Sequence, residues 1–201
     1  MKCIAEKILK CRKCSDRVLQ DSTIPLPHLD GSDYGMPKLN VLAMAPGHPV
    51  VDKEYISNID KLDYKSFYKF YKNDLVTSRF GKFMDTIFKA SGISWDEVFY
   101  TNVIKCHPYQ NKVYPEMIEN CLPYLNEQLE KVTSKNFLLI GSLSCKSIGI
   151  EEKVSNIHGK IIEIKDKKYI PMLHPSFIWR SNKLEQENLS KRIINSLKEI
   201  L

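Results

Sequence analysis

The sequence predicts a three-layer α/β/α sandwich, in which helices cover both faces of a mostly parallel sheet of about four strands. Short apolar segments at 40–44, 98–104 and 136–140 predict buried strands. Between them lie segments whose apolar residues recur at helical spacing. Strands that alternate with helices in this way indicate a sheet covered on both faces. The chain has no internal repeat, and we expect one domain over residues 1–201.

The remaining elements follow from local patterns. Gly92 ends the apolar stripe of 81–91, and Pro115 suits the first turn of the next helix. The segment 21–37 holds prolines, glycines and aspartates and predicts a loop. Further helices are expected around 4–9, after Ser142 and over 189–201, and two further strands within 160–173, which turn at 165–167.

Composition narrows the class of protein. No apolar run reaches the length of a membrane span, and the first residues lack the apolar core of a secretory signal. We therefore expect a soluble, cytoplasmic protein without membrane association. The formal net charge of +6 favours a polyanionic partner such as nucleic acid.

Three loops follow predicted strands. They are Ala45–Pro49, the segment around Asn102 and His107, and His174–Ser176. In open α/β sheets, ligands bind beyond the carboxyl ends of the strands. Because these loops would meet at one sheet edge, the sequence predicts an active site there.

Four of the six cysteines have the spacing of a metal site. Cys11 and Cys14 form a Cys-x-x-Cys pair, and Cys106 and Cys121 lie far downstream. Four thiolates suit an iron–sulfur cluster or zinc. Cys145 is interpreted as an ordinary thiol, as is Cys3, although Cys3 is near enough to the pair to substitute as a ligand.

These motifs have the order found in a known family. The matching pieces are Cys11 and Cys14, Ala45-Pro46-Gly47, Thr101-Asn102-Val103-Ile104-Lys105-Cys106-His107-Pro108, Asn111, Cys121, His174-Pro175-Ser176 and Arg180. Together they span nearly the whole chain. The sequence therefore resembles the uracil-DNA glycosylases of the iron–sulfur type, often called family four.

The resemblance implies a function and a set of partners. It implies a monofunctional DNA glycosylase of base-excision repair that hydrolyses the N-glycosidic bond of uracil and leaves an abasic site. It also implies a structural 4Fe–4S cluster on Cys11, Cys14, Cys106 and Cys121, with zinc as the alternative. The partner would be single- or double-stranded DNA with a flipped base, and the protein a monomer.

The resemblance also implies roles for single residues. His174 would donate a hydrogen bond to a base oxygen, with Ser176 and Arg180 beside it. Asn102 offers an amide that can pair with O4 and N3–H of uracil or, flipped, with the edge of a cytosine derivative. Ala45, Pro46 and Gly47 would form a substrate loop. Asn111 either supports the site or is a plain turn residue.

Several positions depart from the family pattern. Met44 replaces the usual glutamate and Val50 the usual acid, which leaves Asp52 first and His48 second as the residue that orients water. Backbone carbonyls alone could also hold the water. Phe80 is the nearest remnant of the element that stacks on the base.

A long insertion, roughly 53–79, takes the place of that stacking element. Its stretch Tyr64–Lys72 mixes aromatic and basic residues, which suits stacking on nucleic acid or a packed surface helix alike.

These departures leave two alternatives open. The protein could be a glycosylase for another or modified base, for example in foreign DNA. It could also be a non-catalytic DNA-binding iron–sulfur protein with the same fold.

Overall fold

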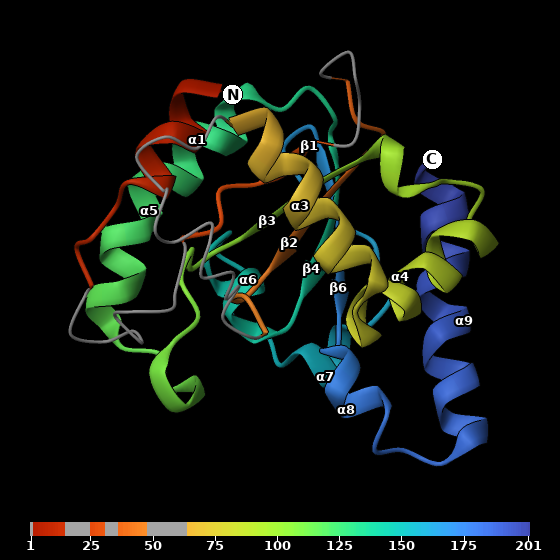
Figure 1. The fold of residues 1–201 in the computed structure, drawn as a ribbon. Helices are drawn as coiled ribbons and strands as arrows, with labels where there is room; N and C mark the ends of the chain where they lie inside the picture. The colour runs from red at the N-terminus through yellow and green to blue at the C-terminus, as the bar shows by residue number, and fades with distance from the viewer. Residues whose placement is uncertain (1, 15–24, 31–35, 48–63) are drawn as a thin grey trace.

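The computed structural model describes residues 2–14, 25–30, 36–47 and 64–201 (Figure 1). Within these residues six strands form one sheet, in the order β1-β3-β2-β4-β6-β5. The four central strands run parallel, and the two edge strands are antiparallel to their neighbours. The strands are β1 (Leu29–Asp30), β2 (Leu39–Ala43), β3 (Val98–Asn102), β4 (Asn136–Ile140), β5 (Ile162–Ile164) and β6 (Lys167–Met172).

The predicted fold class is confirmed, with one correction at a sheet edge. The described residues hold six strands rather than about four: the two strands expected within 160–173 are present as β5 and β6, and the short edge strand β1 was not predicted. The segment 21–37 is not entirely loop, because Leu29 and Asp30 pair with Tyr100 and Phe99. Two paired residues are too few for a hydrophobic pattern to register in the sequence.

Helices cover both faces of the sheet, as predicted. They are α1 (Lys2–Leu9), α3 (Tyr64–Thr77), α4 (Arg79–Ala90), α5 (Pro115–Lys131), α6 (Ser142–Lys146), α7 (Val154–Ile157), α8 (Pro175–Ile178) and α9 (Lys183–Ile200). Successive strand residues point to opposite faces. Val41 therefore packs with α3, α4 and α9, whereas Leu42 packs with α5, α6 and α7.

Helix α3 occupies the second half of the predicted insertion and lies across the sheet in front of β2 and β3 (Figure 1). Phe67, Tyr71 and Leu75 recur every four residues and are buried against the sheet. The packed helix that was one interpretation of the aromatic-basic stretch is therefore present, and stacking on nucleic acid stays a prediction. The aromatic residues bury one side of this helix, while Lys69 is exposed.

Two local features determine how α3 is connected to α4. The Ser78 side chain accepts a hydrogen bond from the backbone N–H of Gly81 at 2.9 Å and so caps α4. A Cβ atom at Gly81 would overlap the carbonyl oxygen of Leu75 and lie 2.7 Å from the Cα atom of Val76. Glycine is therefore required where the two helices meet, and this junction fixes α3 over the site. Among the described residues, no helix is both long and apolar enough to cross a membrane.

Candidate active site at the carboxyl edge of the sheet

The three predicted loops meet at the carboxyl ends of β2, β3 and β6. The backbone N–H groups of Val103 and Ile104 donate to the carbonyls of Ala43 and Met44 at 2.8 and 2.9 Å, which continues the β2–β3 pairing into both loops. His107 Nδ1 donates to the carbonyl of Pro46 at 3.0 Å. His107 thus holds the loop 45–47, a role that its place beside Cys106 in the motif did not indicate.

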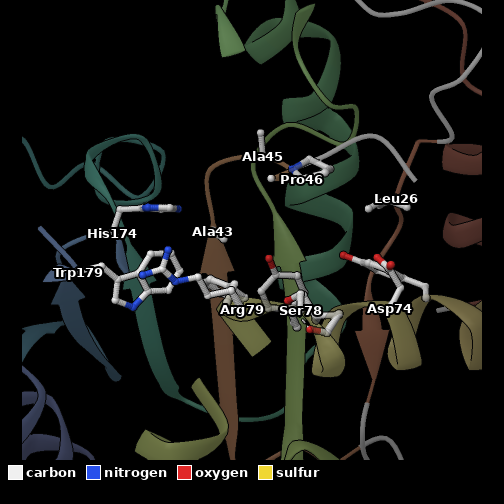
Figure 2. Close-up of a pocket in the computed structure, with 14 residues that line it drawn as sticks. Leu26, Ala43, Ala45, Pro46, Asp74, Ser78, Arg79, His174 and Trp179 are labelled. Atoms are coloured by element: carbon white, nitrogen blue, oxygen red, sulfur yellow. Dashed lines mark hydrogen bonds between the residues drawn. The ribbon is translucent and has the colours of Figure 1, made fainter. Parts of the chain in front are cut away.

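A cavity of about 290 Å³ opens where these loops meet (Figure 2). Figure 2 shows His174 and Trp179 toward one side of it and Leu26 and Asp74 toward the other. The wall combines the substrate loop, the end of β3, the loop after β6 and the inserted helix. Its residues are Leu26, Ala43, Ala45, Pro46, Gly47, Tyr71, Asp74, Leu75, Ser78, Arg79, Phe80, Tyr100, His174 and Trp179.

His174 begins the short helix α8 and has a defined tautomer. The backbone N–H of Ser176 donates to its Nδ1 at 3.2 Å, and the Ser176 hydroxyl lies 2.8 Å from the same atom. Because Nδ1 accepts, the ring hydrogen of the neutral imidazole is on Nε2. Burial lowers the pKa of His174, and the nearby Arg180 lowers it further. His174 is therefore a neutral hydrogen-bond donor at neutral pH.

Asn102 ends β3 and lies just behind the cavity wall. Its side chain is buried, and its Oδ1 accepts a hydrogen bond from the Tyr100 hydroxyl at 3.2 Å. The Tyr71 hydroxyl also bonds the Asn102 side chain, while burial raises the pKa of both tyrosines. Both tyrosines line the cavity, so their hydroxyls connect the amide of Asn102 to it.

The first turn of α4 adds aromatic and cationic groups to the cavity. Phe80 lies against Tyr100, with ring centroids 6.0 Å apart. The Arg79 guanidinium lies 4.1 Å from the centre of the Trp179 ring.

Asp52 and His48, predicted to orient water, lie outside the described residues. Asp74 and Arg79 were missed because only tertiary folding brings them to the site, whereas Tyr71 belongs to the aromatic-basic stretch that stands out in the sequence.

A wider groove of about 780 Å³ adjoins the cavity and shares His174 and the loop Ala45–Gly47 with it. Asn111, Ser176 and Arg180 line this groove. Arg180 Nε donates to the carbonyl of Ser176 at 3.0 Å. Phe177 also lines it and is 51% exposed. A bulky apolar residue directly after His-Pro-Ser was the available signal for it.

The four cysteines of the predicted metal site lie near one another. Burial raises the pKa of Cys106, and the thiols of Cys121, Cys11 and Cys14 raise it further. For Cys145 burial is the single cause of the raised pKa. Among the described residues, no three cysteine, histidine, aspartate or glutamate side chains are arranged so that they could hold a metal ion.

Two further groups donate to these sulfurs. The amide of Asn120 donates to Cys14 Sγ at 3.3 Å, and the backbone N–H of Lys105 donates to Cys121 Sγ at 3.5 Å. Hydrogen bonds to sulfur are the usual surroundings of metal-bound thiolates.

A buried polar network joins the cysteine region to the end of β3. The Lys105 ammonium donates to Thr101 Oγ1 at 2.9 Å, to Gln128 Oε1 at 2.6 Å and to the carbonyl of Asn102 at 2.5 Å. Gln128 in turn bonds the carbonyl of Pro27 and Nδ1 of His28. Burial lowers the pKa of His28 to about 3, so its ring is neutral. This network fixes the backbone of Asn102 from behind.

Fold and site together define an α/β protein with a small-ligand cavity at the carboxyl edge of a parallel sheet. Residues 45–198 match the model of the uracil DNA glycosylase superfamily, and the chain belongs to this superfamily. The predicted family and enzyme class, a DNA glycosylase, are confirmed at this level.

Several known proteins are similar to this chain in sequence. The chain is 24% identical over 194 residues to the Type-4 uracil-DNA glycosylase of Archaeoglobus fulgidus, covering 92% of this chain and 85% of that protein. It is 26% identical over 208 residues to the Type-4 uracil-DNA glycosylase of Sulfurisphaera tokodaii, covering 98% and 81%. It is also 27% identical over 120 residues, 59% of this chain, to the DNA polymerase of Bacillus phage SP01, of which it spans 13%.

Proposed function

We propose that this protein is a monofunctional DNA glycosylase that hydrolyses the N-glycosidic bond of uracil in DNA and leaves an abasic site. The observation that carries the proposal is the neutral His174, whose Nε2–H donor borders a cavity of about 290 Å³. Since one water occupies about 30 Å³ in the liquid, this cavity has room for a flipped pyrimidine base. The Type-4 relatives support uracil as the base.

The groove beside the cavity suits the DNA strand. Arg180 and Lys153 line it and can meet phosphates. The exposed Phe177 ring stands next to His174, where it can enter the base stack and fill the space of the extruded nucleotide. The net charge of +6 adds a sequence-independent attraction to DNA.

The chemistry follows from charge that develops as the bond breaks. The sugar becomes oxocarbenium-like while the base gains negative charge. A donor fixed before the reaction stabilises that charge without reorganising. We assign this role to His174, and base reading to Asn102 with the hydroxyls of Tyr71 and Tyr100. Asp52 first and His48 second remain our proposals for the group that orients the attacking water.

We further propose that Cys11, Cys14, Cys106 and Cys121 hold a 4Fe–4S cluster. An all-thiolate set suits this cluster, and the donors from Asn120 and Lys105 fit sulfurs that carry negative charge. When bound, the cluster would cross-link the N-terminal pair to α5 and to the loop after β3. Zinc is the alternative for the same ligands.

The test uses oligonucleotides that carry one uracil, in single and double strands. We expect strand cleavage only after alkali, because a monofunctional glycosylase leaves the backbone intact. His174→Ala should reduce single-turnover excision about a hundredfold or more, the usual cost of one preorganised donor. Because His174 is not part of the hydrophobic core and phosphate contacts set most of the affinity, DNA affinity and melting temperature should change little. Near-wild-type excision by this variant would refute the assigned role.

The same assay also tests a second candidate function. The departures at Met44 and Val50 favour a non-catalytic DNA-binding protein, if water cannot be activated without the usual acids. Tight DNA binding without excision of uracil or of any modified pyrimidine would establish that function instead.

A further inference from the structure

The inserted helix α3 places a carboxylate in the base cavity. Asp74 lines it one helical turn after Tyr71, and Leu75 is the next wall residue. A carboxylate in a cavity bordered mainly by apolar and aromatic side chains accepts hydrogen bonds and disfavours apolar neighbours. The proposed mechanism assigns no role to Asp74.

The position of Asp74 relative to His174 defines which atom of the base it would face. Of the two uracil oxygens, O4 belongs to the edge read by Asn102, so O2 is the one left for His174. In a pyrimidine ring, C5 lies directly across from C2. Figure 2 shows His174 and Asp74 toward opposite sides of the cavity. A base whose O2 faces His174 therefore directs C5 toward Asp74.

We propose that Asp74 is a specificity-determining residue that reads the substituent at C5 of the pyrimidine. It would exclude thymine, because the C5 methyl group would displace water from the carboxylate without offering a hydrogen bond. It would accept uracil, whose C5 hydrogen leaves room for water. It would favour a pyrimidine whose C5 substituent carries a hydrogen-bond donor, such as a 5-hydroxymethyl group. This inference rests on the proposed glycosylase function and names its substrate class.

Two further features support this assignment. The cavity of about 290 Å³ has space beyond a bare pyrimidine ring, since one water takes about 30 Å³ in the liquid. Asp74 is also held in place by its helix, because Tyr71 and Leu75 on either side are buried against the sheet. A carboxylate on a rigid element discriminates better than one on a loop.

The test compares single-turnover excision of uracil, 5-hydroxymethyluracil and thymine from otherwise identical oligonucleotides. For the wild type we expect 5-hydroxymethyluracil to be excised at least as fast as uracil, and thymine at least about a hundredfold more slowly. Asp74→Leu should lower the ratio of 5-hydroxymethyluracil to uracil excision about tenfold or more, because a hydrogen bond to a charged group is lost. It should also raise the ratio of thymine to uracil excision.

The matched control is Asp85→Asn on α4. The Asp85 carboxylate pairs with Lys89 at 2.6 Å and does not line the cavity. Both ratios should match the wild type in this variant. Unchanged ratios in Asp74→Leu would overturn the inference while leaving uracil excision, and so the proposed function, intact. Absence of excision of every base by the wild type would instead overturn the proposed function.

Discussion

At the scale of single residues, hydrogen bonds from the main chain and from tyrosines prepare the side chains of the site. The backbone N–H of Ser176 selects the tautomer of His174, and the Tyr100 hydroxyl orients the amide of Asn102. These two hydrogen bonds hold the side chains of His174 and Asn102 in one arrangement before a base binds. Preorganisation of this kind is the main source of electrostatic catalysis.

Tyr100→Phe tests the contribution of the hydrogen bond between the Tyr100 hydroxyl and the Asn102 side chain. The variant removes the hydroxyl that donates to Asn102 Oδ1 at 3.2 Å and leaves the ring packing unchanged. We expect uracil excision to slow about tenfold and the free energy of unfolding to fall by about 1 kcal/mol, the usual net value of one hydrogen bond. Single-turnover kinetics and urea unfolding measure the two effects.

Tyr169→Phe is the control for this substitution. Tyr169 is also buried, but it stacks on Phe137 on the other face of the sheet, away from the cavity. Its loss of a hydroxyl should leave excision unchanged. Equal excision rates for Tyr100→Phe and the wild type would show that the Asn102 amide needs no support from Tyr100.

At the scale of elements, α3 connects fold and site. It buries Phe67, Tyr71 and Leu75 in the core and presents Tyr71 and Asp74 to the cavity. Deleting the insertion would therefore remove part of the core, so point substitutions are the better probe of substrate choice. The close contact of α3 and α4 at Gly81 keeps the cavity wall in place.

Gly81→Ala tests this junction. The added Cβ would overlap the carbonyl oxygen of Leu75 and press on the Val76 Cα atom, so one helix must shift. We expect a loss of about 2 kcal/mol or more in unfolding free energy, as for other overpacked sites. Gly47→Ala is the control, because no atom of the described residues lies within 4 Å of its Cβ position and its stability should be unaffected. A stable Gly81→Ala variant would mean that α3 can move without cost.

The elements of the fold were predictable to different degrees. The strands at 40–44 and 136–140 were predicted to within a residue, because uniform apolar segments mark strands buried on both faces. The end of β3 was placed two residues late, since Val103 and Ile104 are as apolar as the strand itself. For Tyr64–Lys72 the pattern fitted two interpretations: the packed helix is present, and stacking on nucleic acid stays a prediction.

The candidate site was predictable where motifs carry it. The loops holding Asn102 and His174 follow predicted strands, and parallel topology brings their ends together. Asp74 could not be predicted, because its place at the cavity depends on how α3 crosses the sheet. Phe177 carried a sequence signal in its position directly after His-Pro-Ser.

At the scale of the whole molecule, the proposed cluster would join parts of the chain that are distant in sequence. We expect purified protein to be brown, with broad absorbance near about 400 nm, as thiolate-bound iron clusters are. Cys121→Ser should lose iron and lower the melting temperature. Cys145→Ser replaces an equally buried thiol outside the site and should retain iron. Colourless wild-type protein with stoichiometric zinc would contradict the iron assignment and preserve the ligands.

The two-residue strand β1 has a consequence for behaviour in solution. It covers the outer edge of β3 and is held by hydrogen bonds from Thr101 and Gln128 to the carbonyl of Pro27. An uncovered strand edge is a template for pairing with another chain. Detachment of this short segment would turn β3 into such a template, so the colloidal stability of the protein depends on a two-residue strand staying in place.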